Sequence, residues 1–171
     1  MTQSGPDRLT RRRLHQVLLT EEAIYGLILV SGMIVVSGSS GSSSVSVLIT
    51  VIVTVAVFYA AHVYAGAVAR LAAVGRAGHL RQSLAHAAKQ SSGLLVAAIV
   101  PVFILALGTT HVISDNIANW TALIVNTVLL AVMGWIAISR WNPSWAARVI
   151  GSIVAASFGV VLILLKAFVT H

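Results

Sequence analysis

The 171-residue sequence contains no cysteine and only four acidic residues. The lack of cysteine excludes disulfides, thiolate zinc sites, iron–sulfur clusters and a cysteine nucleophile. The scarcity of carboxylates leaves little basis for paired-carboxylate hydrolysis or for a hard-cation cage of oxygen ligands. The sequence also has no HExxH, GxSxG or Walker pattern. We therefore expect a protein that is not an enzyme and that has no cofactor and no metal site.

Charged residues of either sign are also scarce, and apolar residues are abundant. Charged residues make up 9% of the chain and apolar residues 58%, with a mean hydropathy of +0.95, whereas soluble domains have about 25% charged residues. A helix needs about 20 residues to cross the hydrocarbon core of a bilayer. Five stretches have this length or nearly so, at 22–38, 46–69, 93–110, 120–139 and 149–168. The sequence predicts an all-α, polytopic membrane protein with five transmembrane helices.

The basic residues predict how these helices are oriented. They precede the first stretch, follow the second and join the fourth to the fifth, whereas the loops GSSGSSS and HVISDNIAN contain no Lys or Arg. The positive-inside rule then places the N-terminus in the cytoplasm and the C-terminus outside. In a bacterium this would be the cytoplasmic membrane. The formal charge of +7 is explained by topology, so we expect no nucleic-acid partner.

Two basic segments flank or interrupt the apolar stretches. Residues 1–20 form a cytoplasmic segment with helical spacing of its apolar residues, and residues 70–92 form a basic connection within a single transmembrane domain at 21–171. In the connection, Leu80, Leu84 and Ala87 share one helical face. Both segments are typical of amphipathic helices on an anionic leaflet. The basic residues predicted to face lipid are Arg11, Arg12, Arg13, Arg76 and Arg81.

The stretch FYAAHVYAGAVAR places His62 inside the second apolar stretch, eight residues before Arg70. This spacing corresponds to about 12 Å along a helix. Imidazole titrates near neutral pH and can exchange protons, so an ionisable group within the membrane is a candidate for function. Tyr59 lies on the same helical face, and Glu22 and Tyr25 begin the first helix from the same side. Alternatively, a neutral His62 bonds to a hydroxyl or carbonyl group and holds two helices together.

Other features of the apolar stretches indicate helix packing. Gly151, Ala155 and Gly159 recur every fourth residue, a pattern that lets helices approach closely within or between subunits. Asn126 favours an interhelical hydrogen bond. Lys166, near the outer end of the last stretch, is expected to extend its ammonium group to the lipid headgroups.

Three short segments resemble a known family. EEAIYGLILV at 21–30, AAHVY at 60–64 and SRWNPSWAARVIGS at 139–152 are similar to segments of the vacuolar iron transporter (VIT-like) family, which also has five spans and a cytoplasmic N-terminus. The resemblance implies this architecture and a homodimer. The metal-ligating positions of the family fall on Ile28, Leu29, Tyr59 and Val63 here, so its ligands are not retained.

Two hypotheses of function follow. The first is a transporter or channel for a proton or a small cation, with Glu22, Tyr25, Tyr59 and His62 lining the path. The second is a non-transporting membrane subunit or scaffold that binds a partner or anionic lipid through its basic cytoplasmic surface. The scarcity of acidic groups within the spans favours the second, whereas the polar groups at matched depth favour the first.

Overall fold

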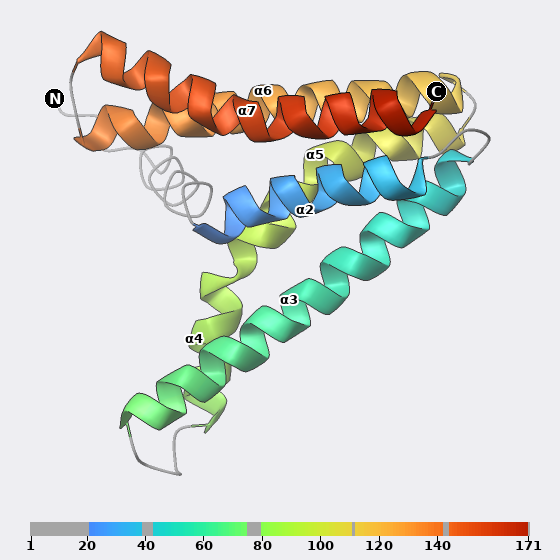
Figure 1. Cartoon of the computed structure of the whole chain (residues 1–171). Coiled ribbons are helices and arrows are strands. Elements are labelled where there is room, and N and C mark those ends of the chain that lie inside the picture. The colour runs from blue at the N-terminus through green and yellow to red at the C-terminus, as the bar shows by residue number, and fades with distance from the viewer. Residues whose placement is uncertain (1–20, 39–42, 75–79, 111, 142–143, 171) are drawn as a thin grey trace, which may run out of the picture.

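The computed structural model describes residues 21–38, 43–74, 80–110, 112–141 and 144–170. These residues form helices joined by short turns, with no strand among them. The helices are α2 (Glu21–Ser37), α3 (Ser44–Val74), α4 (Leu80–Gln90), α5 (Ser92–Thr109), α6 (Asp115–Trp141) and α7 (Trp145–Thr170) (Figure 1). The predicted all-α class is confirmed for these parts of the chain.

Four helical runs are long and apolar enough to cross a membrane. They are Ser44–Ala73, the run Leu80–Thr109 through α4 and α5, Asp115–Trp141 and Trp145–Val169. These runs identify a multi-pass integral membrane protein. The helix at the first predicted stretch, α2, has 17 residues, at the lower end of the length that can span a bilayer.

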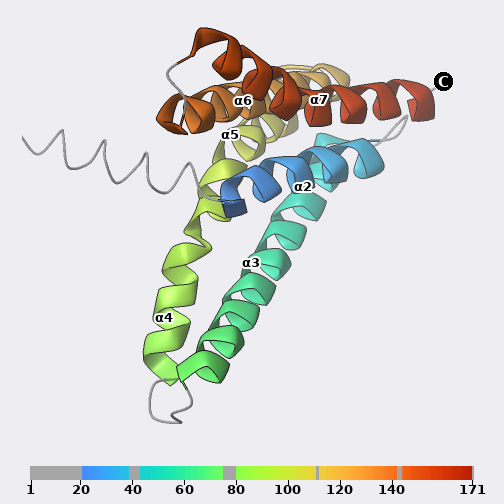
Figure 2. The ribbon, with the colours of Figure 1, turned by 60° about the vertical axis from the view of Figure 1, so that its left-hand side comes forward.

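The helices pack as a bundle from which one arm diverges. α2, α5, α6 and α7 lie together, and α3 joins them at its N-terminal end (Figures 1 and 2). The rest of α3 runs away from the bundle beside α4. We call the described residues at 58–74 and 80–90 the α3–α4 arm. The arm exists because α3, with 31 residues, is about 46 Å long and continues past the bundle.

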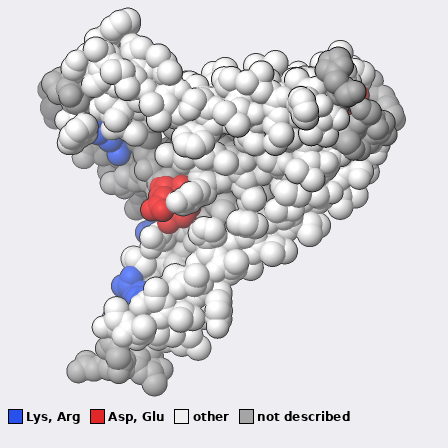
Figure 3. Space-filling view, viewed as in Figure 1, with Lys and Arg blue, Asp and Glu red and all other residues white. Residues whose placement is uncertain are grey.

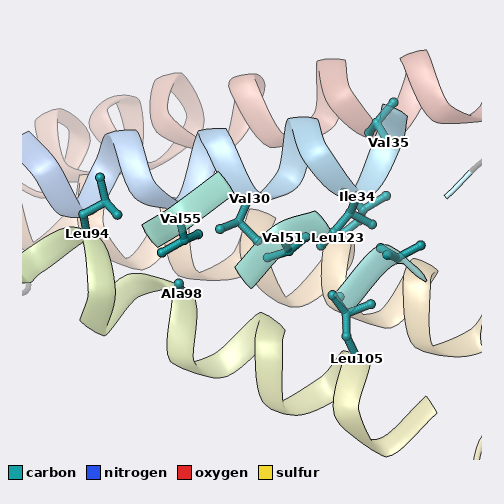
Figure 4. Close-up of a cluster of buried hydrophobic side chains, with 11 residues drawn as sticks. Val30, Ile34, Val35, Val51, Val55, Leu94, Ala98, Leu105 and Leu123 are labelled. Atoms are coloured by element: carbon teal, nitrogen blue, oxygen red, sulfur yellow. The ribbon is translucent and has the colours of Figure 1, made fainter. Parts of the chain in front are cut away.

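Small and branched side chains fill the centre of the bundle. Val30 and Ile34 of α2, Val51 and Val55 of α3, and Leu94 of α5 belong to one buried cluster (Figure 4). Lipid is as apolar as these side chains, so van der Waals packing between helices provides most of the stabilisation here. Packing of this kind requires helices that approach closely.

α6 and α7 approach closely through the predicted small residues. A methyl group at Gly134 would contact the Gly151 carbonyl oxygen and lie 2.7 Å from Cβ of Ala155. A methyl group at Gly159 would lie 2.8 Å from Cβ of Thr127. The Gly151, Ala155 and Gly159 stripe therefore lies against α6 within one chain.

α4 packs on α3 through a face that includes Ala87, one of the three apolar residues predicted to share a face toward lipid. Ser83 and Ala87 are buried, whereas Leu80 and Leu84 are exposed. The contact is made by small residues, because a methyl group at Gly66 of α3 would lie only 3.2 Å from Cβ of Ala87. Leu80 and Leu84 consequently remain available to lipid.

Candidate binding cleft

A cleft of about 430 Å³ lies where the arm leaves the bundle. Its walls come from the first turn of α2, the middle of α3 and the junction between α4 and α5. At the junction α4 ends, Ser91 is buried, and its amide group donates a 2.8 Å hydrogen bond to the Ala87 carbonyl oxygen. The chain changes direction there, so that Gln90 and Ser91 lie opposite α3. The polar lining residues are Glu22, His62, Gln90 and Ser91; Val57, Phe58, Ala61, Ala65, Gly66 and Ala87 complete the wall.

The cleft brings together two of the predicted site residues, Glu22 and His62. His62 is partly buried, and its Nδ1 lies 3.0 Å from the Phe58 carbonyl oxygen. A carbonyl oxygen can only accept, so Nδ1 carries the proton, and in the neutral ring Nε2 is then a hydrogen-bond acceptor. Because Phe58 belongs to the same helix, this bond does not hold two helices together. It orients the imidazole ring and leaves Nε2 available to a ligand.

Glu22 supplies a carboxylate to the cleft from the first turn of α2. The N-terminus of a helix carries about +0.5 of an elementary charge, which favours a carboxylate at this position. Figure 3 shows an acidic surface where α2 begins, with basic surface over α4 nearby. Glu21 is more exposed than Glu22 and does not line the cleft. The two neighbouring carboxylates therefore have different surroundings.

His62 lies where the arm leaves the bundle, beside the first turn of α2. Arg70 was expected to mark the membrane boundary, with His62 about 12 Å inside it. In the structure His62 shares a cleft with the first turn of α2 and with the start of α5. The chain from Ser44 to His62 advances 18 residues along α3, or about 27 Å, close to the thickness of a hydrocarbon core. The remainder of α3 belongs to the arm.

The two predicted tyrosines are placed differently. The Tyr59 hydroxyl donates a 3.3 Å hydrogen bond to the Ala88 carbonyl oxygen, which fastens α3 to α4. Tyr25 is 52% exposed and does not line the cleft. The structure thus brings Glu22 and His62 together, uses Tyr59 to hold the arm, and leaves Tyr25 at the surface.

Polar side chains inside the bundle make interhelical contacts. The Asn126 side-chain amide of α6 donates to Oγ of Ser31 at 2.9 Å and to the Leu27 carbonyl oxygen at 3.4 Å. The predicted interhelical role of Asn126 is confirmed. It fastens α6 to α2, the helix that carries Glu22.

Lys166 departs from its expected place at the lipid headgroups. Its side chain is 2% exposed, and its ammonium group donates a 2.8 Å hydrogen bond to the Gly38 carbonyl oxygen at the end of α2. The same group lies 5.7 Å from the centre of the Trp120 ring. A helix C-terminus favours a cation, which explains why Lys166 turns inward. The isolated lysine in an apolar helix was the only sign of this contact in the sequence.

The basic residues predicted to face lipid are placed only in part by the structure. Arg81 is exposed on α4, whereas Arg11, Arg12, Arg13 and Arg76 lie outside the described residues. Ile28, at a metal-ligand position of the resembling family, packs against buried apolar side chains. Within the described parts of the chain, no three His, Asp or Glu residues are grouped to hold a metal ion.

Comparisons with models of known protein families, with curated proteins and with solved structures found no match. The fold and the cleft therefore define the protein as a helical, multi-pass membrane protein, and the side chains of the cleft carry the argument about function.

Proposed function

We propose that the protein binds a small cation or a proton in this cleft and moves it across the membrane. The observation that carries the proposal is the shared placement of Glu22 and His62 in one cleft between three helical segments. A carboxylate attracts a cation, and an imidazole can accept and release a proton. Ionisable groups at such a position are costly to keep near lipid and are commonly functional.

Ion flux into proteoliposomes tests the transport function. We expect the wild-type protein to carry protons or divalent cations faster than empty liposomes between about pH 5 and 8. His62→Ala should abolish the increase. His86→Ala is the matched control, because His86 is exposed on α4 and does not line the cleft. Flux equal to that of empty liposomes throughout this range would contradict the proposal.

A second candidate function is a non-transporting membrane subunit or scaffold. It is favoured by the use of Tyr59, Asn126 and Lys166 as bonds between helices. In that case the wild-type protein would give no more flux than empty liposomes, and a partner would purify with the protein. The flux experiment therefore separates the two functions.

The proposal also includes the setting of the protein in the membrane. We place the N-terminus and the basic connection at 70–92 in the cytoplasm, with five spans including α2, and the C-terminus outside. The exposed basic residues Arg70, Arg81 and Lys89 lie on the arm, where they would meet anionic lipid headgroups. A VIT-like kinship and a homodimer are further parts of the proposal, and they rest on the resemblance in the sequence.

A further inference from the structure

We infer that the cleft selects an amine attached to a compact apolar body, rather than a bare inorganic ion. The inference rests on the proposed function and deepens it, because it takes the same cleft as the binding site and narrows the small cation to an organic ammonium ion. Flux of divalent cations would therefore support the proposed function but count against this ligand. It depends on three properties of the cleft, namely its size, its wall and the chemistry of its polar groups.

The size and the wall of the cleft favour an organic ligand. A volume of about 430 Å³ lies in the range of small-molecule sites, about 300–1,000 Å³. Most of the wall is made by alanine, glycine, valine and phenylalanine side chains. A bare cation placed against such a wall would lose hydration without replacement. An apolar group on the ligand would instead pack against Phe58, Ala61 and Ala65.

The polar groups favour an ammonium group. The Glu22 carboxylate accepts hydrogen bonds from a cationic donor, and His62 Nε2 provides a second acceptor in the neutral ring. The full negative charge of Glu22 exceeds the half positive charge of the helix N-terminus beside it. A metal ion needs more ligands, because zinc takes four and calcium six to eight. Glu22 and His62 alone do not meet that need.

The adjacent surface does not reverse this preference. Lys89 directly precedes the lining residue Gln90, and Arg70 lies four residues after the lining residue Gly66 on α3. Both basic side chains are exposed, and neither lines the cleft. Charges of this kind are screened by water and salt. Among the described residues that line the cleft, Glu22 carries the full charge.

Equilibrium binding of 4-phenylbutylamine to the full chain in phosphatidylcholine nanodiscs tests the inference, with empty nanodiscs measuring partition into lipid. We expect saturable binding that exceeds the empty-disc signal. The isosteric alcohol 4-phenylbutanol should bind about tenfold more weakly, because it lacks the charge-assisted hydrogen bond. This comparison uses the wild-type protein and does not depend on the folding of a variant.

Two pairs of substitutions locate the bound amine. Glu22→Gln should weaken binding about tenfold, whereas Glu21→Gln, one residue away and outside the cleft, should change it less than about twofold. Ala61→Leu should abolish binding by filling the cleft, whereas Ala60→Leu, on an exposed position that does not line it, should not.

Three results would overturn the inference. The first is equal binding of the amine and the alcohol, and the second is an equal affinity of Glu22→Gln and Glu21→Gln for the amine. The third is a loss of amine affinity when phosphatidylethanolamine replaces phosphatidylcholine, because a lipid headgroup would then be the ligand of the cleft. Flux of inorganic cations without amine binding would refute this ligand class and leave transport standing. Amine binding without any flux would support the ligand site and refute transport.

Discussion

Replacing Lys166 with methionine removes the ammonium group that bonds to the end of α2 and keeps a side chain of similar length. A hydrogen bond from a charged donor contributes about 1.5–3 kcal/mol, and a cation–π contact about 0.5–2 kcal/mol. Against these contributions stands the cost of keeping an ammonium group out of water, which is several kcal/mol. The substitution removes all these terms together.

The Gly38 carbonyl group decides the net effect. Gly38 is buried, and its carbonyl oxygen would lose the donor that lies 2.8 Å away. A buried acceptor that loses its donor costs about 1–3 kcal/mol. We therefore expect Lys166→Met to lower the free energy of unfolding by about 2 kcal/mol.

Reversible unfolding in mixed detergent micelles, followed by far-UV circular dichroism, measures this change. The other lysine of the chain, Lys89, provides the matched control because it is exposed on α4. Lys89→Met should change the free energy of unfolding by less than about 0.5 kcal/mol. The reasoning is refuted if Lys166→Met is as stable as the wild type or if both substitutions have the same effect.

Three further predictions concern packing and topology. Gly134→Ala should destabilise the protein by about 1–3 kcal/mol through overpacking. Gly32→Ala, with open space around the new methyl group, should stabilise the protein slightly because alanine has a higher helix propensity than glycine. Unfolding of both variants in micelles measures the difference, and equal effects would contradict the close α6–α7 contact. Asn126→Ala should cost about 0.6–1.7 kcal/mol, the range of interhelical hydrogen bonds in membranes, and an unchanged midpoint in the same assay would argue against the Ser31 bond. Because the chain has no cysteine, single cysteines introduced at Ser43 and Ala85 can be labelled with a membrane-impermeant maleimide in intact cells. Ser43→Cys should react and Ala85→Cys should not. The reverse labelling pattern would show that the orientation is opposite to the proposed one.

The sequence predicted the helical stretches well because length and hydropathy depend on local composition. Each of the five predicted stretches overlaps a helix, but α3 runs to Val74 instead of Ala69, and α6 and α7 begin at Asp115 and Trp145 instead of at 120 and 149. Nothing in the local composition marks where a helix leaves a bundle. The place of His62 in the cleft could not be predicted in full, since it depends on how α2 and α5 pack beside α3.

The candidate site was predicted in part for the same reason. The sequence grouped Glu22 with His62 because the first helix begins on the side of the membrane toward which His62 lies. The contributions of Gln90 and Ser91 to the cleft depend on the turn between α4 and α5, which helical spacing does not reveal. The position of the Lys166 ammonium group was predicted wrongly because the prediction took account only of its own helix and the surrounding lipid. Its actual partner, Gly38, is 128 residues away in sequence.

The α3–α4 arm also has a consequence for the local stability of the protein. Its two helices are joined by one tyrosine hydrogen bond and by contacts between small residues, and α4 packs chiefly on α3. Regions with so few buried apolar contacts open at a lower free energy than the core of a fold. The arm should therefore exchange its amide hydrogens as a separate cooperative unit, faster than the bundle. One wall of the cleft can thus open while the helices that hold Asn126 and Lys166 stay folded.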